Sequence, residues 1–489
     1  MDRLASELVH RIFTFLPVED IGNFRLVCKG FSEIGIEYVC SNTQFTFMTN
    51  EDLEKLVKLS KQTDIARGVK SLSYAPVTLR PGLSDDQYYD LHVMFVWSYN
   101  DLYSIYKPIS DEQAEILKRK FDYACLLSAL PRFPRLKHMS LYFDGISRQH
   151  FECISTPGRR IRRAFEHLFA VKHCGRDHLR TLLQVLSETK VNLESLTIRG
   201  ADPYFFDWEE IRTGAPFEPI SRLKRLDISF DADLWTASDA TNGRIMALQH
   251  LESGVAVKYL QALPELQTLR VEFYDYWSAY AYMRRPEQWL PIPLNALATH
   301  DSVWANLRTL RLEHVKCDRQ DIWDLLLRHK GTLREVCLKN MNLQSTSWVP
   351  LLDSIRKELY LTKPCICGDI CGTSEVRSVN DGDNGEENNE EEVEMEKERW
   401  ILKRYNGLFE LVNSYIMRGG EAEPKLKECP LPLKGDQGVE SALDTIAKLR
   451  DGDLPWQGWE EISKSEGYDR WAETCVELCG KAEYVLDHN

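Results

Sequence analysis

The chain has 489 residues, of which 43% are hydrophobic and 10% aromatic, and its formal net charge at pH 7 is −14. This composition is typical of a folded protein. The chain is longer than a single hydrophobic core usually supports, so we expect two units or an elongated repeat domain. An acidic chain lacks the basic face that general nucleic-acid binding requires. The charge is also uneven, because residues 375–398 hold 11 acidic and 2 basic side chains, a net charge of −9.

The N-terminus carries no pattern of a secretory signal. Asp2, Arg3, Glu7 and Arg11 interrupt any apolar run there, and no stretch of the chain approaches the roughly 18 apolar residues of a membrane span. The thirteen cysteines are scattered at irregular spacing, which indicates free thiols in a reducing compartment. We therefore expect a cytoplasmic or nuclear protein, or one found in both, without a membrane partner.

Two short amphipathic patterns open the chain. Leu4, Leu8, Ile12 and Leu16 recur every four residues and predict one stripe along a helix. Pro17 ends this helix, because it cannot donate a hydrogen bond to the carbonyl four residues back.

A second helix is predicted to follow, with Glu19 and Asp20 in its first turn, where the helix dipole favours negative charge. Its apolar positions recur at helical spacing and are Ile21, Phe24, Val27, Cys28 and Phe31. Two such helices carry more apolar surface than 31 residues can bury alone, so either a partner or the rest of the protein covers them.

Residues 4–31 resemble an F-box, the module that docks a substrate receptor onto the Skp adaptor of a cullin-based ubiquitin ligase. The resemblance lies in the order Leu, Glu-Leu, Ile-Phe, Leu-Pro, Asp-Ile and then Arg-Leu-Val-Cys-Lys followed by an aromatic residue; Ala5 stands where the family usually has proline. It implies a set of residues that bear on the adaptor, some by direct contact and some by holding the helices together: Leu4, Leu8, Ile12, Leu16, Ile21, Phe24, Val27 and Phe31. The alternative is an ordinary helical part of a larger core.

A loose repeat of the form Leu-x-x-Leu-x-Leu follows, with other apolar residues allowed. Its last two apolar positions lie two residues apart, which places both on one face of a short strand, and a helical run precedes most copies. The copies start at Leu136, Leu193, Leu223, Leu266, Leu307 and Leu333, with a weaker one at Val69.

Residues 223–228 and 307–312 resemble the strand segment of leucine-rich repeats. The spacings between copies are 57, 30, 43, 41 and 26 residues, so these are degenerate repeats with long insertions. Stacked strand–helix units of this kind bury a continuous core as a solenoid. The alternative is a series of short core strands in another α/β fold.

The insertions after the predicted strands are rich in aromatic residues. Aromatic and arginine side chains dominate the hot spots of protein interfaces, so we predict a substrate-binding rim there. Its residues are Phe205, Trp208, Trp235, Tyr276, Trp277, Tyr280, Arg284 and Arg285. The alternative is that these rings only cover the apolar edge of the repeats.

The C-terminal part begins with the acidic stretch 373–395, which has too few apolar residues to order itself and is predicted to be a disordered linker. Apolar residues from Trp400 to Ile416 then predict a long amphipathic helix that ends at Gly419-Gly420. We expect this segment to cap the last repeat.

Motifs of catalysis are absent from the sequence: there is no Gly-x-Ser-x-Gly, no His-Glu-x-x-His and no Gly-x-x-x-x-Gly-Lys-Ser/Thr. Cys365, Cys367 and Cys371 lie close together, but they lack the paired Cys-x-x-Cys spacing of zinc ligands. We therefore expect neither a metal ion, nor another cofactor, nor catalysis.

The expected fold is α/β: an all-α F-box in residues 1–45, an irregular leucine-rich-repeat-like solenoid in 46–372, the linker in 373–395 and a helical cap in 396–489. The resemblances imply a non-catalytic substrate-recognition subunit of an SCF-type E3 ubiquitin ligase, whose partners are a Skp-type adaptor, through it a cullin, and an unknown target protein. Two alternatives stay open. One is an F-box scaffold that works outside ubiquitination, and the other is a solenoid that binds a small molecule or acts as an unrecognised hydrolase.

Overall fold

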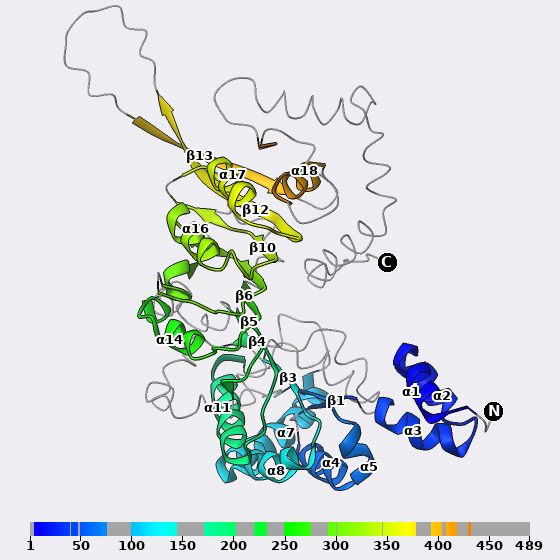
Figure 1. Cartoon of the computed structure of the whole chain (residues 1–489). Coiled ribbons are helices and arrows are strands. Elements are labelled where there is room, and N and C mark those ends of the chain that lie inside the picture. The colour runs from blue at the N-terminus through cyan, green and yellow to red at the C-terminus, as the bar shows by residue number, and fades with distance from the viewer. Residues whose placement is uncertain are drawn as a thin grey trace, which may run out of the picture. The chain divides into compact units, whose positions relative to one another are not determined.

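The protein is described by a computed structural model of the whole chain (Figure 1). The structure describes residues 4–39, 41–46, 49–75, 99–143, 171–201, 220–231, 249–274, 292–299, 301–344, 346–377, 393–402, 407–417 and 429–431. The chain divides into two compact units. Unit 1 comprises residues 1–251, 262–266 and 274–284, and unit 2 comprises 252–261, 267–273 and 285–489.

Unit 1 begins with three helices, α1 (Ser6–Phe15), α2 (Val18–Phe24) and α3 (Lys29–Val39). The carbonyl of Ala5 accepts hydrogen bonds from the amides of Leu8 and Val9, so α1 starts at Ser6 without the proline typical of this position. The chain is extended at Leu16 and Pro17, where α1 ends as the sequence predicts.

A parallel sheet follows in unit 1, and its strands pair in chain order. Helices lie between the strands and pack on one another, α4 on α8 and α8 on α11. Tyr74 on β2 lies 3.2 Å from His178 on α11, and His178 lies 3.7 Å from Asp122 on α8, all three buried. The elements are β1 (Asn42–Thr46), α4 (Asn50–Lys61), α5 (Thr63–Gly68), β2 (Ser71–Ala75), α7 (Tyr99–Arg119), α8 (Phe121–Ala129), β3 (His138–Tyr142), α11 (Val171–Thr189), β4 (Ser195–Ala201) and β5 (Arg225–Asp231).

Unit 2 carries its own parallel strands in the order β6–β8–β10–β12. A second set, β7–β9–β11, runs parallel and joins the later part of β12, which β13 pairs antiparallel. Helices α16 and α17 pack together. The elements are α14 (Val255–Gln261), β6 (Thr268–Tyr274), β7 (Ile292–Pro293), β8 (Thr309–Glu313), β9 (Val315–Cys317), α16 (Arg319–Arg328), β10 (Glu335–Lys339), β11 (Asn342–Leu343), α17 (Trp348–Glu358), β12 (Lys363–Arg377), β13 (Val393–Leu402) and α18 (Gly407–Ile416).

The apolar pairs of the predicted repeat occupy equivalent places in these strands. In unit 1, Leu72, Met139, Leu196 and Leu226 are register partners, and in unit 2 Leu269, Leu310 and Val336 are. The second position of each pair is in register in the same way, and all of these side chains are buried. The strand positions read from the sequence are therefore those of the structure.

Backbone hydrogen bonds repeat with the same period. At the start of a strand, two successive amides donate to one carbonyl of the preceding repeat, as the amides of Arg334 and Glu335 do to Arg308. The same arrangement recurs at other carbonyls, namely those of Ser41, Lys70, Lys137, Glu194, Gln267 and Arg334. Each strand thus joins its neighbour through a shared backbone geometry, which keeps the apolar positions in register.

A left-handed residue follows the strand in several repeats, and this is where the chain turns into the next short strand. His314, Asn340 and Gly368 have φ of 57°, 52° and 79°, and they follow β8, β10 and the first part of β12. Replacing Gly368 would strain the backbone at this positive φ, and a Cβ there would also clash with the side chain of Asn340.

The C-terminal part differs from the prediction. Trp400 and Ile401 lie in β13, so the predicted helix starting at Trp400 is wrong, and the observed helix α18 begins at Gly407 and ends at Ile416. Residues 373–377 and 393–395 of the predicted linker lie in β12 and β13. Pairing with β12 across the sheet satisfies the backbone of β13, which a local sequence pattern does not reveal.

The fold class is α/β with an N-terminal helical module and parallel strands, as predicted. No closed or curled sheet is found among the described strands, so the leucine-rich-repeat solenoid stays a prediction.

Candidate functional site

The three N-terminal helices enclose a small core of their own. Val9 and Phe13 of α1, Ile21 of α2 and Phe31 of α3 are at most 5% exposed. Partly buried side chains surround them, namely Leu16, Phe24, Cys28, Ile34, Tyr38 and Val39. The three helices therefore fill the core of this module with their own side chains, and no partner is needed to complete it.

Aromatic rings fill most of this core. The ring of Phe13 stacks on Tyr38 with centroids 5.5 Å apart, and meets the edge of Phe31 at 6.2 Å. Phe24 stacks on Phe31 at 6.0 Å. Such ring pairs add stabilisation to that of apolar burial, and they prefer particular ring geometries. They therefore restrict how the three helices pack against one another.

The opposite side of α1 is apolar and exposed. Leu8 is 52% exposed, Ile12 36% and Phe15 78%, while Leu4, just before the helix, is 45% exposed. At 100° per residue these positions form one stripe, turned away from Val9 and Phe13. Helix α1 thus presents two apolar faces, of which the three-helix core covers one.

Two more apolar side chains are exposed in the turn between α2 and α3, Leu26 at 86% and Val27 at 52%. We call these two residues together with Leu4, Leu8, Ile12 and Phe15 the N-terminal apolar surface. Elsewhere in the described part of the chain, Val303 and Tyr360 are the other large exposed hydrophobic side chains. Exposed apolar side chains gathered in one short module indicate a protein-binding surface.

Polar contacts hold the module to itself and to the rest of unit 1. The Nε of Arg25 donates to the carbonyl of Ser32 at 3.2 Å, and the ring of His10 lies 2.9 Å from the hydroxyl of Tyr38. Arg135 forms a 2.8 Å ion pair with Glu37 near the end of α3.

The structure divides the predicted adaptor residues into two groups. Leu4, Leu8, Ile12 and Val27 are exposed, whereas Ile21 and Phe31 are buried and Leu16 and Phe24 pack against the core. Phe15 and Leu26 are exposed as well but are not among the predicted residues, although the spacing of Phe15 from Leu8 and Ile12 is that of the stripe. The predicted substrate-binding residues 205, 208, 235, 276, 277, 280, 284 and 285 lie outside the described residues.

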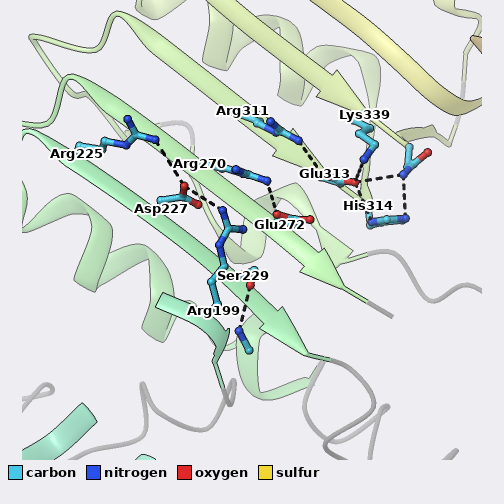
Figure 2. A network of polar contacts seen from close by, with 12 residues as sticks. Arg199, Arg225, Asp227, Ser229, Arg270, Glu272, Arg311, Glu313, His314 and Lys339 are labelled. Atoms are coloured by element: carbon cyan, nitrogen blue, oxygen red, sulfur yellow. Dashed lines mark hydrogen bonds and ion pairs between the residues drawn. The ribbon is translucent and has the colours of Figure 1, made fainter. Parts of the chain in front are cut away.

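Charged side chains line the sheet face opposite the repeated apolar pairs (Figure 2). In unit 1, Asp227 is 2% exposed and lies 3.3 Å from Arg199 and 3.8 Å from Arg225. The hydroxyl of Ser229 accepts a hydrogen bond from the amide of Gly200 at 3.1 Å.

In unit 2 the charged side chains concentrate around Glu313 (Figure 2). This buried carboxylate lies 2.6 Å from the ammonium of Lys339 and 3.3 Å from the guanidinium of Arg311, and accepts a hydrogen bond from Asn340 at 3.4 Å. Burial raises the pKa of Glu313, but the positive charge of Lys339, His314 and Arg311 lowers it more, and the net pKa is below the ordinary value. Burial lowers the pKa of Lys339, yet Glu313 raises it above its usual range, so this pair stays ionised.

Comparison with known protein families assigns the N-terminal module. Residues 1–34 match the family model described as the F-box domain, the stretch that contains α1, α2 and the first half of α3. A comparison of the chain with curated proteins found no significant match. None of the helices in the described ranges is both long and apolar enough to cross a membrane. The N-terminal apolar surface therefore belongs to an F-box domain, a module that generally mediates binding to an SCF adaptor.

Proposed function

We propose that this chain is a substrate-recognition subunit of an SCF-type ubiquitin ligase. The F-box helices bind a Skp-type adaptor and through it a cullin, while the rest of the chain holds a target protein. The supporting observation is that the F-box domain carries an exposed apolar surface on a module whose core is already filled. The chain itself performs no chemistry; it raises the effective concentration of the target's lysines near a charged ubiquitin-conjugating enzyme. Such a complex works in the cytoplasm, the nucleus or both.

Within this proposal the residues of the F-box have two roles. The N-terminal apolar surface contacts the adaptor directly. The buried residues Val9, Phe13, Ile21 and Phe31 position that surface without touching the adaptor, because they are enclosed by the three helices.

We further propose that the strands from β2 to β10 are degenerate leucine-rich repeats. The support is the recurrence of buried apolar pairs in register and of paired amides on one carbonyl from repeat to repeat. The insertions that follow these strands would supply the surface that recognises the target protein.

Co-purification with a Skp-type adaptor tests the proposal. Leu8→Asp combined with Ile12→Asp places two charges on side chains that are already solvent-exposed, so the isolated chain keeps its fold. In the complex these charges would be buried and unpaired, which costs at least several kcal/mol and abolishes binding. Val303→Asp is the matched control, because Val303 is 58% exposed and lies outside the F-box.

The expected result is that the wild type and Val303→Asp carry the adaptor through purification and the double variant does not, while circular dichroism shows all three folded. Absence of the adaptor from the wild type, or its retention by the double variant, contradicts the proposal. A complex that contains adaptor but excludes cullin identifies a scaffold that works outside ubiquitination.

A further inference from the structure

Three buried cysteines meet on one face of unit 2. Cys337 comes from β10, and Cys365 and Cys367 come from β12, with exposed fractions of 3%, 1% and 6%. Their sulfur atoms all lie within 4.8 Å of one another, and those of Cys365 and Cys367 are 3.7 Å apart. Three thiols from two strands converge there, although 28 residues separate Cys337 from Cys365 in the sequence.

The strand register explains the convergence. Cys337 pairs with Cys365 across the ladder between β10 and β12, and Cys367 lies two residues further along β12 on the same face of the strand. The pairing is parallel and fixed on both sides of the cysteines, from Glu335 with Lys363 to Lys339 with Cys367. The cluster is therefore held by rigid sheet geometry and does not depend on a loop.

Cations stand next to the thiols in the same two rows of the sheet. Arg311 on β8 is the register partner of Cys337, and Lys339 on β10 is the register partner of Cys367. Lys339 is also an electrostatic neighbour of Cys367. These positive groups therefore lie beside the sulfurs that would carry negative charge as metal-bound thiolates.

We propose that Cys337, Cys365 and Cys367 form a binding site for a divalent, thiophilic metal ion, zinc. A zinc–sulfur bond is about 2.3 Å long, so sulfurs around one tetrahedral ion lie about 3.8 Å apart, and the observed cluster needs to close by no more than about 1 Å. Within the described residues no other histidine, cysteine or carboxylate joins the group, so these three thiolates are the protein ligands that the proposal assigns.

Binding breaks three S–H bonds and forms three metal–sulfur bonds, and three protons pass to the solvent. No oxidant or reductant is required, because zinc does not change its oxidation state. The site is independent of the F-box, and a failure of either proposal leaves the other untouched.

Titration of the metal-free, reduced full-length chain with Co²⁺ tests the site, because thiolate ligands give cobalt an intense near-ultraviolet charge-transfer band. We expect one equivalent of Co²⁺ to bind and zinc to displace it. Cys337→Ala removes one ligand and should weaken binding at least about 100-fold, since even loss of an outer-shell partner costs 10–100-fold. The control is Cys317→Ala, which removes another buried thiol of unit 2 outside the cluster.

X-ray absorption of the zinc-loaded wild type keeps the test decisive if Cys337→Ala does not fold. The expected spectrum has about three sulfur ligands per zinc at about 2.3 Å. A wild-type chain that takes up no cobalt, a spectrum with two sulfurs or fewer, or a folded Cys337→Ala variant that binds as tightly as Cys317→Ala overturns the proposal.

Discussion

At the scale of single residues, Gly35 packs closely against Arg25 and Phe13 in the F-box core. A Cβ built on this residue of α3 would lie 2.5 Å from the Cγ of Arg25 and 3.0 Å from the ring of Phe13. Gly35→Ala should therefore destabilise unit 1 by about 1–3 kcal/mol through overpacking. Chemical denaturation, followed by the midpoint of the transition, measures the change.

Gly30, earlier in the same helix, is the matched control. Nothing lies within 4 Å of a Cβ built there, so Gly30→Ala should stabilise the helix by about 0.5–1 kcal/mol, since alanine restricts the unfolded chain more than glycine. Equal effects of the two substitutions would contradict the packing described for Gly35.

Glu313 supplies a prediction about pH. Its folded pKa lies below the unfolded value of about 4.3, so its contribution to stability is fully present above that value and is lost as the pH falls through the lower folded pKa. Glu313→Gln removes the carboxylate beside the buried Arg311 and the partly buried Lys339, and should cost about 3–5 kcal/mol at neutral pH. Unfolding free energies measured from neutral to acidic pH should show a shallower acid decline in the variant.

A control is available on the next strand. Glu335 forms a 3.0 Å ion pair with Lys363, but both side chains are at least a quarter exposed, so Glu335→Gln should change stability by no more than about 1 kcal/mol. If the two variants lose the same stability, burial is not what makes the Glu313 cluster strong.

At the residue scale, periodicity predicts which side chains share one face of a helix, but it does not predict which of them are buried. Spacing placed Leu8 and Ile12 on one stripe of α1, and the structure exposes both. Periodicity also grouped Leu16 with them, although Leu16 follows the end of α1 and packs on the core. Which apolar positions stay exposed depends on where α2 and α3 cross α1, and that is a property of tertiary packing.

At the scale of elements, α18 closes the free edge of β12. The side-chain amide of Asn413 accepts a hydrogen bond from the amide of Ile366 at 2.7 Å and donates to the carbonyl of the same residue at 3.1 Å. The side chain of Asn413 thus makes the two backbone hydrogen bonds that a residue of a neighbouring strand would make with Ile366. Asn413 is fully buried, and its amide also donates to the carbonyl of Phe409 within its own helix at 2.8 Å.

Asn413→Ala should leave the amide and carbonyl of Ile366 unpaired and cost about 1–3 kcal/mol for each group. Hydrogen exchange at the Ile366 amide should accelerate, and the neighbouring partly exposed Ser414→Ala variant should leave it unchanged. Protection that survives in Asn413→Ala would show that α18 does not close the edge.

Elements were predictable from the sequence where their pattern is local. The apolar pairs of β3, β4 and β8 and the helical run of α16 are readable from spacing alone. Strand β13 was not, because residues 393–399 are mostly charged, and the antiparallel partner that makes them a strand is β12. The thiol cluster was missed for the same reason, since Cys337 approaches Cys365 only through strand pairing.

At the scale of the whole molecule, sequence and structure agree on an F-box followed by parallel strand–helix units. The hydrophobic pattern encodes the core, because every repeat must bury the same two positions. The insertions, which carry the proposed target-binding surface, differ in length, and no spacing recurs in them from one repeat to the next.

The exposure of the N-terminal apolar surface leads to a prediction about the isolated protein that does not depend on which adaptor binds it. Exposed apolar side chains that no part of the described chain covers should make the isolated protein self-associate and bind a hydrophobic dye. Leu8→Asp with Ile12→Asp should reduce both, while Val303→Asp should not, because Val303 is a single exposed residue outside the F-box. Light scattering against protein concentration measures the association, and bound adaptor should suppress it as the double variant does. Equal scattering by the wild type and the double variant would mean that this surface is not the one that requires a partner.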